Sequence, residues 1–253
     1  MTRTALVVLA AGEGTRAGHD TNKVLLPLAG RRVFTWSIRW AHSLPQVAQV
    51  VLVIREADRE QVMAALAREL PEVEVEVVVG GPSRHESEWR ALQALSPSIR
   101  DGRTDVVVIH DAARPLAGAQ VFRDVIEAAQ LYGGALPVRD QPALTRLSKV
   151  HDPGDPEIRR TVAVQTPQAF RAQPLLEAYA RASEDRFVGT DTASCVERYT
   201  DVAVHCVPGD AGNIKITFPE DLFLAERLLA KAGWDLSTDP QSRAAGETRR
   251  RRR

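Results

Sequence analysis

The chain has 253 residues, and 44% of them are hydrophobic, so it has enough apolar side chains to bury one substantial core. The charges balance at 33 basic and 33 acidic residues, but six arginines and one acid, Glu247, lie within residues 241–253. Residues 1–240 therefore carry a net charge of −5, and nucleic-acid binding by this part of the chain is not expected.

The cysteines and the hydrophobic runs indicate the cellular compartment of the protein. Cys195 and Cys206 are too few for a disulfide framework or a cysteine metal cluster, which favours a reducing compartment. No apolar run approaches the roughly 18 residues that a membrane span requires, and a strand pattern begins too early for a signal peptide. We therefore expect a soluble, cytoplasmic protein without a membrane partner.

The first thirty residues contain the strongest local pattern. Residues 4–10 form an apolar run of strand length, which breaks into the small-residue loop 11–16 (AGEGTR). A buried strand that ends in a glycine turn brings backbone N–H groups to the carboxyl edge of a sheet, where ligands bind in open α/β folds. Arg16 and Lys23 add positive charges suited to phosphates. The pattern predicts a triphosphate site, although glycine loops of this kind are also plain strand-to-helix connections.

The chain after this loop alternates between strand and helix patterns. Because helices of ten or more residues separate the strands, we expect a mostly parallel sheet covered on both faces, a single-domain three-layer α/β sandwich. The patterns predict helices at 32–42, 57–70, 121–131 and 219–231 and from about 83 to 95, and strands at 50–54, 73–79, 105–109, 134–138, 202–206 and 214–217.

Residues 139–165 interrupt the alternation. Two turns and two short strand patterns, at 144–150 and 161–164, predict a hairpin with little apolar surface of its own. Such an arm usually packs on something else, so we expect it to pair two subunits in a homodimer; the alternative is an ordinary surface hairpin. We expect residues 1–232 to form the domain and residues 233–253, which include Arg249 to Arg253, to be a disordered basic tail.

The motif HDAARP at residues 110–115 directly follows the predicted strand 105–109. An aspartate at the carboxyl end of a strand, beside a triphosphate site, is well placed to hold Mg²⁺, which takes one or two carboxylates together with phosphate oxygens. Asp111 could instead only cap the following turn. Arg114, three residues further on, favours the functional interpretation.

These motifs resemble those of known nucleotidyltransferases. The opening pattern, residues 9–16 with Lys23, resembles the superfamily that activates sugars and polyols with nucleoside triphosphates. The HDAARP motif resembles the hallmark of the 2-C-methyl-D-erythritol 4-phosphate cytidylyltransferases and of the related ribitol 5-phosphate cytidylyltransferases. Further matches span residues 1–232: Gly80-Gly81 with Arg84 and Ser87, residues 137–140 (PVRD), 165–168 (QTPQ), Thr190-Asp191, 213–215 (NIK) and 219–221 (PED).

The resemblance implies a Rossmann-like fold and a reaction that moves CMP from CTP to 2-C-methyl-D-erythritol 4-phosphate with Mg²⁺. It implies that Asp111 binds the metal. The implied residues are Arg16, Lys23 and Lys215 for catalysis, Ala10, Ala11, Gly12, Gly14, Gly81, Ser87, Asp111 and Arg114 for the nucleotide, and Thr166, Thr190 and either Arg159 or Arg160 for the acceptor.

Two departures from the family pattern lie on the acceptor side. Gln141 stands where the family has a threonine, and Ile158 where it has an arginine. Ribitol 5-phosphate or another polyol phosphate is therefore an alternative acceptor. A nucleotide-binding relative without activity is a further alternative, which the joint presence of Arg16, Lys23, Asp111 and Lys215 disfavours. A uridylyltransferase would fit the opening motif but not HDAARP.

Overall fold

The computed structural model describes residues 3–12, 22–140 and 162–232, and its centre is a mixed sheet. The strands follow the order β10-β7-β9-β6-β1-β4-β5, with β8 paired to β7. Most neighbours are parallel, but β9 runs antiparallel to both β6 and β7. The bounds are β1 (Thr4–Leu9), β4 (Val47–Ile54), β5 (Glu76–Val79), β6 (Val106–Asp111), β7 (Gly134–Asp140), β8 (Val162–Val164), β9 (Gln168–Arg171) and β10 (Val204–Pro208).

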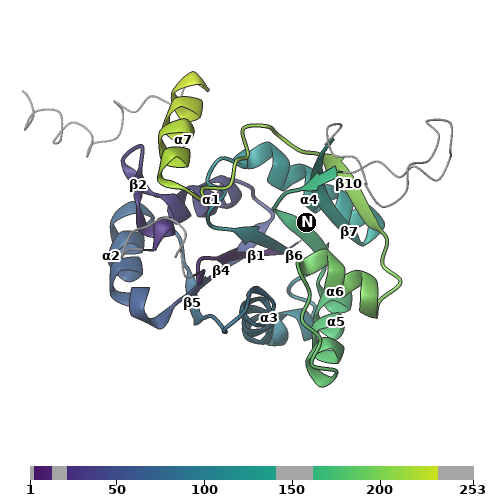
Figure 1. Cartoon of the computed structure of the whole chain (residues 1–253). Coiled ribbons are helices and arrows are strands. Elements are labelled where there is room, and N and C mark those ends of the chain that lie inside the picture. The colour runs from purple at the N-terminus through teal and green to yellow at the C-terminus, as the bar shows by residue number, and fades with distance from the viewer. Residues whose placement is uncertain (1–2, 13–21, 141–161, 233–253) are drawn as a thin grey trace, which may run out of the picture.

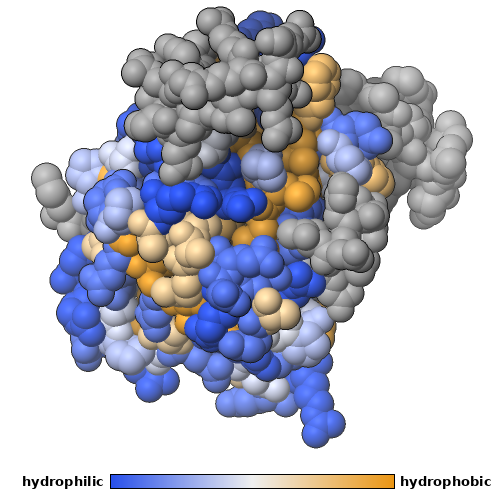
Figure 2. Space-filling view, turned by 90° about the vertical axis from the view of Figure 1, so that its left-hand side faces the viewer, coloured by the Kyte–Doolittle hydropathy of each residue, from blue (hydrophilic) through white to orange (hydrophobic). Residues whose placement is uncertain are grey.

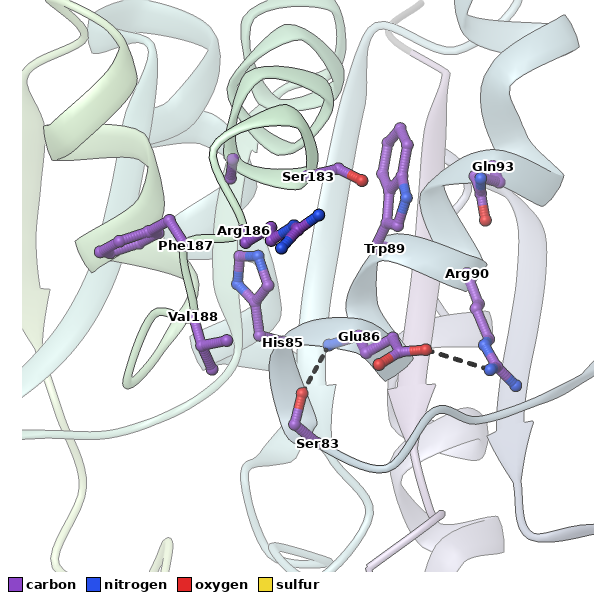
Figure 3. Close-up of a pocket in the computed structure, with 11 residues that line it drawn as sticks. Ser83, His85, Glu86, Trp89, Arg90, Gln93, Ser183, Arg186, Phe187 and Val188 are labelled. Carbon is purple, nitrogen blue, oxygen red and sulfur yellow. Dashed lines mark hydrogen bonds and ion pairs between the residues drawn. The ribbon is translucent and has the colours of Figure 1, made fainter.

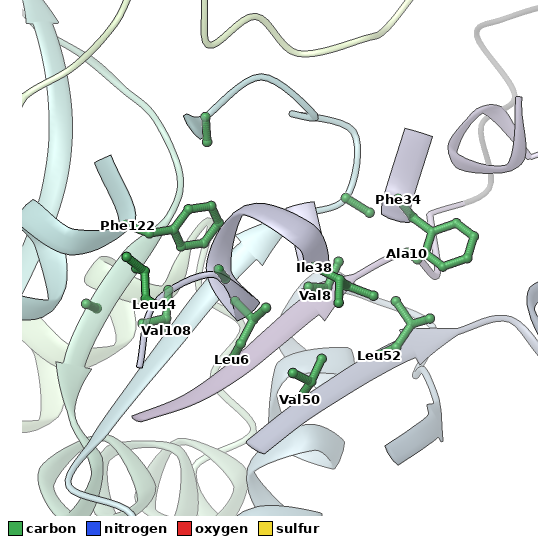
Figure 4. Close-up of a cluster of buried hydrophobic side chains, with 14 of the residues drawn as sticks. Leu6, Val8, Ala10, Phe34, Ile38, Leu44, Val50, Leu52, Val108 and Phe122 are labelled. Carbon is green, nitrogen blue, oxygen red and sulfur yellow. The ribbon is translucent and has the colours of Figure 1, made fainter. Parts of the chain in front are cut away.

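Helices cover both faces of this sheet, which confirms the predicted three-layer α/β fold (Figure 1). Because side chains alternate along a strand, Leu6 and Val8 of β1 join the core on one face, while Ala5 and Val7 join the core on the other. Figure 4 shows the first of these cores. The helices on that face are α1 (Val33–His42), α2 (Arg59–Glu69) and α4 (Gly118–Tyr132), and those on the other are α3 (Arg84–Arg100), α5 (Ala172–Glu184) and α6 (Thr192–Tyr199).

A smaller third core joins the last helix to an early hairpin. The strands β2 (Pro27–Leu28) and β3 (Arg31–Arg32) pair around Ala29 and Gly30, whose φ angles of 49° and 82° both lie in the left-handed region that two-residue hairpin turns require. Trp36 of α1 and Leu229 of α7 (Pro219–Lys231) both belong to this core.

The structure differs from the sequence-based expectations in one predicted strand and in three elements that were not predicted, and one predicted pairing is not tested. The predicted strand at 214–217 is wrong, because Ile216 donates a single backbone hydrogen bond, to Ala113 O at 2.8 Å, and the segment crosses the end of β6 without pairing along it. β8 pairs with residues 138–140 of β7; its predicted partner, 144–150, lies outside the described residues. The sequence patterns did not predict β9, α5 or α6.

The surface and the cysteines add little to the assignment of function. Figure 2 shows a mainly hydrophilic side of the molecule, with hydrophobic residues gathered in a band. Cys195 is buried, Cys206 is exposed, and neither forms a disulfide. Within the described ranges, every helix is too short or too polar to cross a membrane.

Candidate active site

Asp111 lies at the carboxyl end of β6, opposite Leu9 of the parallel strand β1. Its carboxylate accepts hydrogen bonds from two cations that come from distant parts of the chain. The Arg84 guanidinium, at the start of α3, donates to Oδ1, and Lys215 Nζ donates to Oδ2 at 2.7 Å. Burial alone would raise the pKa of Asp111, but Arg84 and Lys215 outweigh it and hold this pKa well below its usual range. Asp111 is therefore ionised.

The backbone of Asp111 is fixed by Thr166 and His110. His110 Nε2 lies 3.0 Å from the carbonyl oxygen of Arg114, which only accepts, so Nε2 carries the proton. Burial lowers the pKa of His110 to about 4, and the ring is neutral near pH 7. Nδ1 therefore accepts from the Thr166 hydroxyl at 3.2 Å, and the same hydroxyl accepts from the Asp111 N–H at 3.1 Å. The three residues form one ordered chain of donors and acceptors.

Lys215 reaches Asp111 because the segment before it is clamped in place. Asn213 is fully buried, and its amide donates to Thr166 O at 2.9 Å. Arg114 Nη1 donates to Asn213 O at 2.8 Å, and Gln165 Nε2 donates to the same carbonyl at 3.2 Å. Arg114, which was predicted to bind the nucleotide, therefore hydrogen-bonds the backbone two residues before Lys215. The predicted strand at 214–217 does not form.

The predicted nucleotide residues at the ends of β1 and β5 lie together. A Cβ added to Gly80 would come within 2.5 Å of Ala11 Cβ and 2.9 Å of Ser87 Oγ, so only glycine permits this approach. Gly81 N–H donates to Ser87 Oγ at 3.1 Å. The N-terminus of α3, capped by Ser83, begins directly after this contact, and helix N-termini favour anions.

The loop that contains the predicted phosphate ligands is anchored on both sides. Ala10 N–H donates to Val53 O at 2.7 Å, and the Asn22 amide donates to Ala10 O at 3.0 Å. Lys23 begins the short helix η2 (Lys23–Leu25) on the far side. A Cβ at Gly12 would meet no atom within 4 Å. Four predicted residues lie outside the described ranges: Gly14, Arg16, Arg159 and Arg160.

The predicted acceptor residues divide between two places. Thr166 contacts the backbone of Asp111, as described above. Thr190 is exposed just before α6, where its N–H donates to Ser194 Oγ at 3.1 Å. Among the described residues Thr190 makes no hydrogen bond to Asp111 or Lys215. Gln168 on β9 donates to the neighbouring Asp191 at 3.2 Å and so ties this loop to the sheet.

Sequence reasoning did not assign a role to Arg84 or Glu88. Arg84 was only a motif match, and its ion pair with Asp111 spans 27 residues. Glu88 lies fully buried one turn after Arg84, on the helix face that also buries Leu92 and Leu95. An acid at that spacing among apolar residues is the signal that could have identified it.

Two further observations limit what the site can be. Among the described residues, no group of three or more His, Cys, Asp or Glu side chains is arranged to hold a metal ion, so Asp111 would have to bind one with substrate oxygens. A cavity of about 420 Å³ lies elsewhere on α3 (Figure 3), and it includes neither Asp111 nor Lys215. It is lined by Ser83, His85, Glu86, Trp89, Arg90, Gln93, Ala182, Ser183, Arg186, Phe187 and Val188.

Comparisons with known proteins agree with these motifs. Residues 4–231 match the family described as IspD, 2-C-methyl-D-erythritol 4-phosphate cytidylyltransferase. The enzyme of that name from Solibacter usitatus is 36% identical over 242 residues, covering 90% of this chain and 96% of the relative. The one from Symbiobacterium thermophilum is 38% identical over 232 residues, covering 89% and 92%.

Solved structures show the same fold. The synthase of 4-diphosphocytidyl-2C-methyl-D-erythritol from Anaerococcus prevotii matches with a TM-score of 0.74 at 22% identity, covering 90% of this chain and 96% of that one. The cytidylyltransferase from Thermus thermophilus matches with a TM-score of 0.65 at 29% identity, covering 90% and 98%. The chain therefore belongs to the 2-C-methyl-D-erythritol 4-phosphate cytidylyltransferase family of nucleotidyltransferases.

Proposed function

We propose that this chain transfers CMP from CTP to 2-C-methyl-D-erythritol 4-phosphate and releases pyrophosphate. The observation that supports this most directly is the Lys215–Asp111–Arg84 cluster at the carboxyl end of β6. It places a carboxylate and two cations at the edge of the sheet where α/β folds bind nucleotides, beside the hydrogen bond from Gly81 N–H to Ser87 Oγ.

The reaction needs positioning and charge neutralisation more than proton transfer. An oxygen of the acceptor phosphate attacks the α-phosphorus of CTP, and pyrophosphate leaves in line with the new bond. Because the attacking phosphate is already anionic, no general base is required. Lys215 is the cation best placed to move, since its side chain is 47% exposed whereas that of Arg84 is 28% exposed. In our proposal Lys215 bridges the α-phosphate and the acceptor phosphate.

Asp111 fits a magnesium site in which one protein carboxylate binds the metal. Its carboxylate is ionised, and when Lys215 turns to the phosphates, Oδ2 is the oxygen that becomes accessible. Phosphate oxygens and water would complete the ligand set, as is usual for Mg²⁺. When bound, the metal would neutralise charge on the triphosphate. Arg84 keeps its hold on Oδ1 and orients the carboxylate.

The remaining sequence predictions enter the same proposal. Arg16 and Lys23 bind the triphosphate, and the backbone of residues 10–12 with Gly81 and Ser87 holds cytosine and ribose. The contact of Gly81 with Ser87 supports the second assignment. Thr166, Thr190 and Arg159 or Arg160 bind the acceptor, and the hydrogen bond from the Asp111 N–H to the Thr166 hydroxyl supports the assignment of Thr166.

The assembly and the setting are also proposals. We propose a homodimer through the arm at 139–165, supported by β8, which extends β7 at the base of this segment. We propose residues 1–232 as the catalytic domain, since α7 ends at Lys231 and the family match at residue 231. A cytoplasmic location agrees with two cysteines that form no disulfide.

The direct test is pyrophosphate release by the full chain with CTP and Mg²⁺, offering 2-C-methyl-D-erythritol 4-phosphate and ribitol 5-phosphate in parallel. We expect turnover with the first acceptor. Turnover with ribitol 5-phosphate alone would replace the acceptor and keep the chemistry. Binding of CTP without turnover on either acceptor would contradict the proposed function. UTP in place of CTP is the control for nucleotide choice.

A further inference from the structure

Glu88 is a buried carboxylate that the proposed reaction does not use. The residue is 0% exposed, and two hydroxyl donors and one cation surround its two oxygens. Tyr179 donates its hydroxyl to Oε2, Thr192 Oγ1 donates to Oε1 at 3.0 Å, and Arg84 Nε forms an ion pair with Oε1 at 3.1 Å. Burial raises the pKa of Glu88, while the Arg84 cation and the two hydroxyl donors act in the opposite direction and favour the ionised carboxylate.

Stability alone is a poor explanation for a charge in this position. Glu88 shares its helix face with Leu92, Leu95 and Ile99, which pack in the core of that side of the sheet. A buried ion pair usually adds little net stability compared with apolar residues of similar volume, because desolvation offsets the attraction between the charges. What the carboxylate does provide is a fixed orientation for its cation.

That cation is Arg84, which lies between two carboxylates. Nε lies 3.1 Å from Glu88 Oε1 in an ion pair, and Nη1 donates a hydrogen bond to Asp111 Oδ1. The guanidinium is planar and rigid, so anchoring its Nε edge determines where its Nη1 edge points. Asp111 thus has one oxygen held by an anchored cation and the other held by the more exposed Lys215.

Glu88 also connects this pair to the acceptor side of the site. Thr192 is the first residue of α6, directly after the N-cap Asp191. Thr190 lies two residues before it, and Gln168 joins Asp191 to β9. The hydrogen bond from Thr192 to Glu88 therefore links the start of α6 to the start of α3, where Arg84 lies.

We propose that Glu88 is a positioning residue for the transfer reaction: through Arg84 it orients Asp111 for the metal and nucleotide, and through Thr192 it sets the acceptor loop against them. The inference rests on the proposed function, because the proposed function assigns Asp111 to the metal and Thr190 to the acceptor. It predicts that loss of the charge at residue 88 disturbs the metal–nucleotide complex although Glu88 touches neither.

The test variant is Glu88→Gln, in which the amide keeps the size of the side chain but carries no charge; its oxygen can accept from one of the hydroxyls of Tyr179 and Thr192, and its NH2 group can donate to the other. The matched control is Glu69→Gln. Glu69 is also buried, at 7% exposure, and it accepts from Thr35 and pairs with Arg68 at 2.7 Å, but it lies on α2, away from Asp111. Melting temperatures of both variants report any structural loss.

The first readout is the binding of Mn²⁺, as a spin-active stand-in for Mg²⁺, to full-length protein with a non-hydrolysable CTP analogue. We expect Glu88→Gln to weaken Mn²⁺ binding by roughly 10–100-fold, the range seen for residues that orient metal ligands, and Glu69→Gln to leave it within about twofold. The second readout is turnover, in which we expect kcat to fall by a similar factor and the KM for the acceptor to rise.

Two results would overturn the proposal: unchanged Mn²⁺ binding and kinetics in Glu88→Gln, or losses in both variants that simply follow their melting temperatures. Failure of the proposed function is distinguishable from these. A wild-type protein that binds Mn²⁺ with the CTP analogue but turns over no acceptor would contradict the reaction, while the Mn²⁺ comparison would still decide the role of Glu88.

Discussion

Lys215 and Asp111, 104 residues apart in the chain, meet with Nζ 2.7 Å from Oδ2 at the carboxyl end of β6. The contact depends on two clamps: Asn213 is hydrogen-bonded to the carbonyl of Thr166, and Arg114 to the carbonyl of Asn213. In our proposal this lysine exchanges its carboxylate partner for phosphate when substrates bind. In this proposal, the ion pair is the position that Lys215 occupies before substrates bind.

Replacing Lys215 with methionine tests this role. We expect kcat to fall by about 10²–10³-fold, since one charge that stabilises the transition state is lost while the aliphatic stem remains. Lys231→Met, at the end of α7, is the control, and it should keep wild-type turnover. Pyrophosphate release measures both. Retention of most activity by Lys215→Met would remove this lysine from the mechanism.

Asp111→Asn should abolish metal-dependent turnover and leave the fold intact, because the amide keeps the shape but loses the charge. The control is Asp105→Asn, just before the other end of the same strand, where the exposed carboxylate pairs with Arg3. Circular dichroism checks the fold, and Mn²⁺ titration with a CTP analogue checks the site. Full activity of Asp111→Asn without metal would refute the metal role.

The buried His110 predicts a specific loss of stability in mild acid. The folded state holds its pKa at about 4, whereas the unfolded chain binds a proton near pH 6.5, so the neutral ring favours folding above pH 6.5. The neutral ring contributes about 3 kcal/mol to the free energy of unfolding, and this contribution is lost as the pH falls from 6.5 to 4. Urea unfolding across this window measures it. His110→Gln should show a shallower dependence of stability on pH.

Gly80→Ala should disturb the nucleotide side of the site. Its Cβ would lie 2.5 Å from Ala11 Cβ, and relief of such overlap costs about 1–3 kcal/mol of stability. We expect a lower melting temperature and a higher KM for CTP. Adding Ala11→Gly removes the nearest clashing atom, so the double variant should recover part of the loss. No recovery would mean that the contact with Ala11 is not the cause.

Removing residues 241–253 should leave the KM for CTP and kcat unchanged, because this arginine-rich segment lies outside the proposed catalytic domain. Steady-state kinetics of the truncated and full chains, at matched ionic strength, make the comparison. A large loss of CTP affinity on truncation would assign these arginines to substrate binding.

The sequence by itself determined the features that arise from local pattern. The apolar run of β1, the periodicity of α2 and the Pro219–Asp221 start of α7 reflect burial or capping within one element, and the structure confirms them. The motif at 110–115 identified Asp111 in the same way, since an acid directly after a buried strand lies at a ligand-binding edge.

Only the tertiary structure decided which distant groups meet. Nothing local shows that Arg84 lies between Glu88 and Asp111, or that Lys215 arrives on an irregular segment rather than on the predicted strand. The antiparallel position of β9 between β6 and β7 likewise depends on which strands pair with each other. The physical reason is that periodicity records how one segment is buried, whereas ion pairs and strand order depend on contacts between segments far apart in the chain.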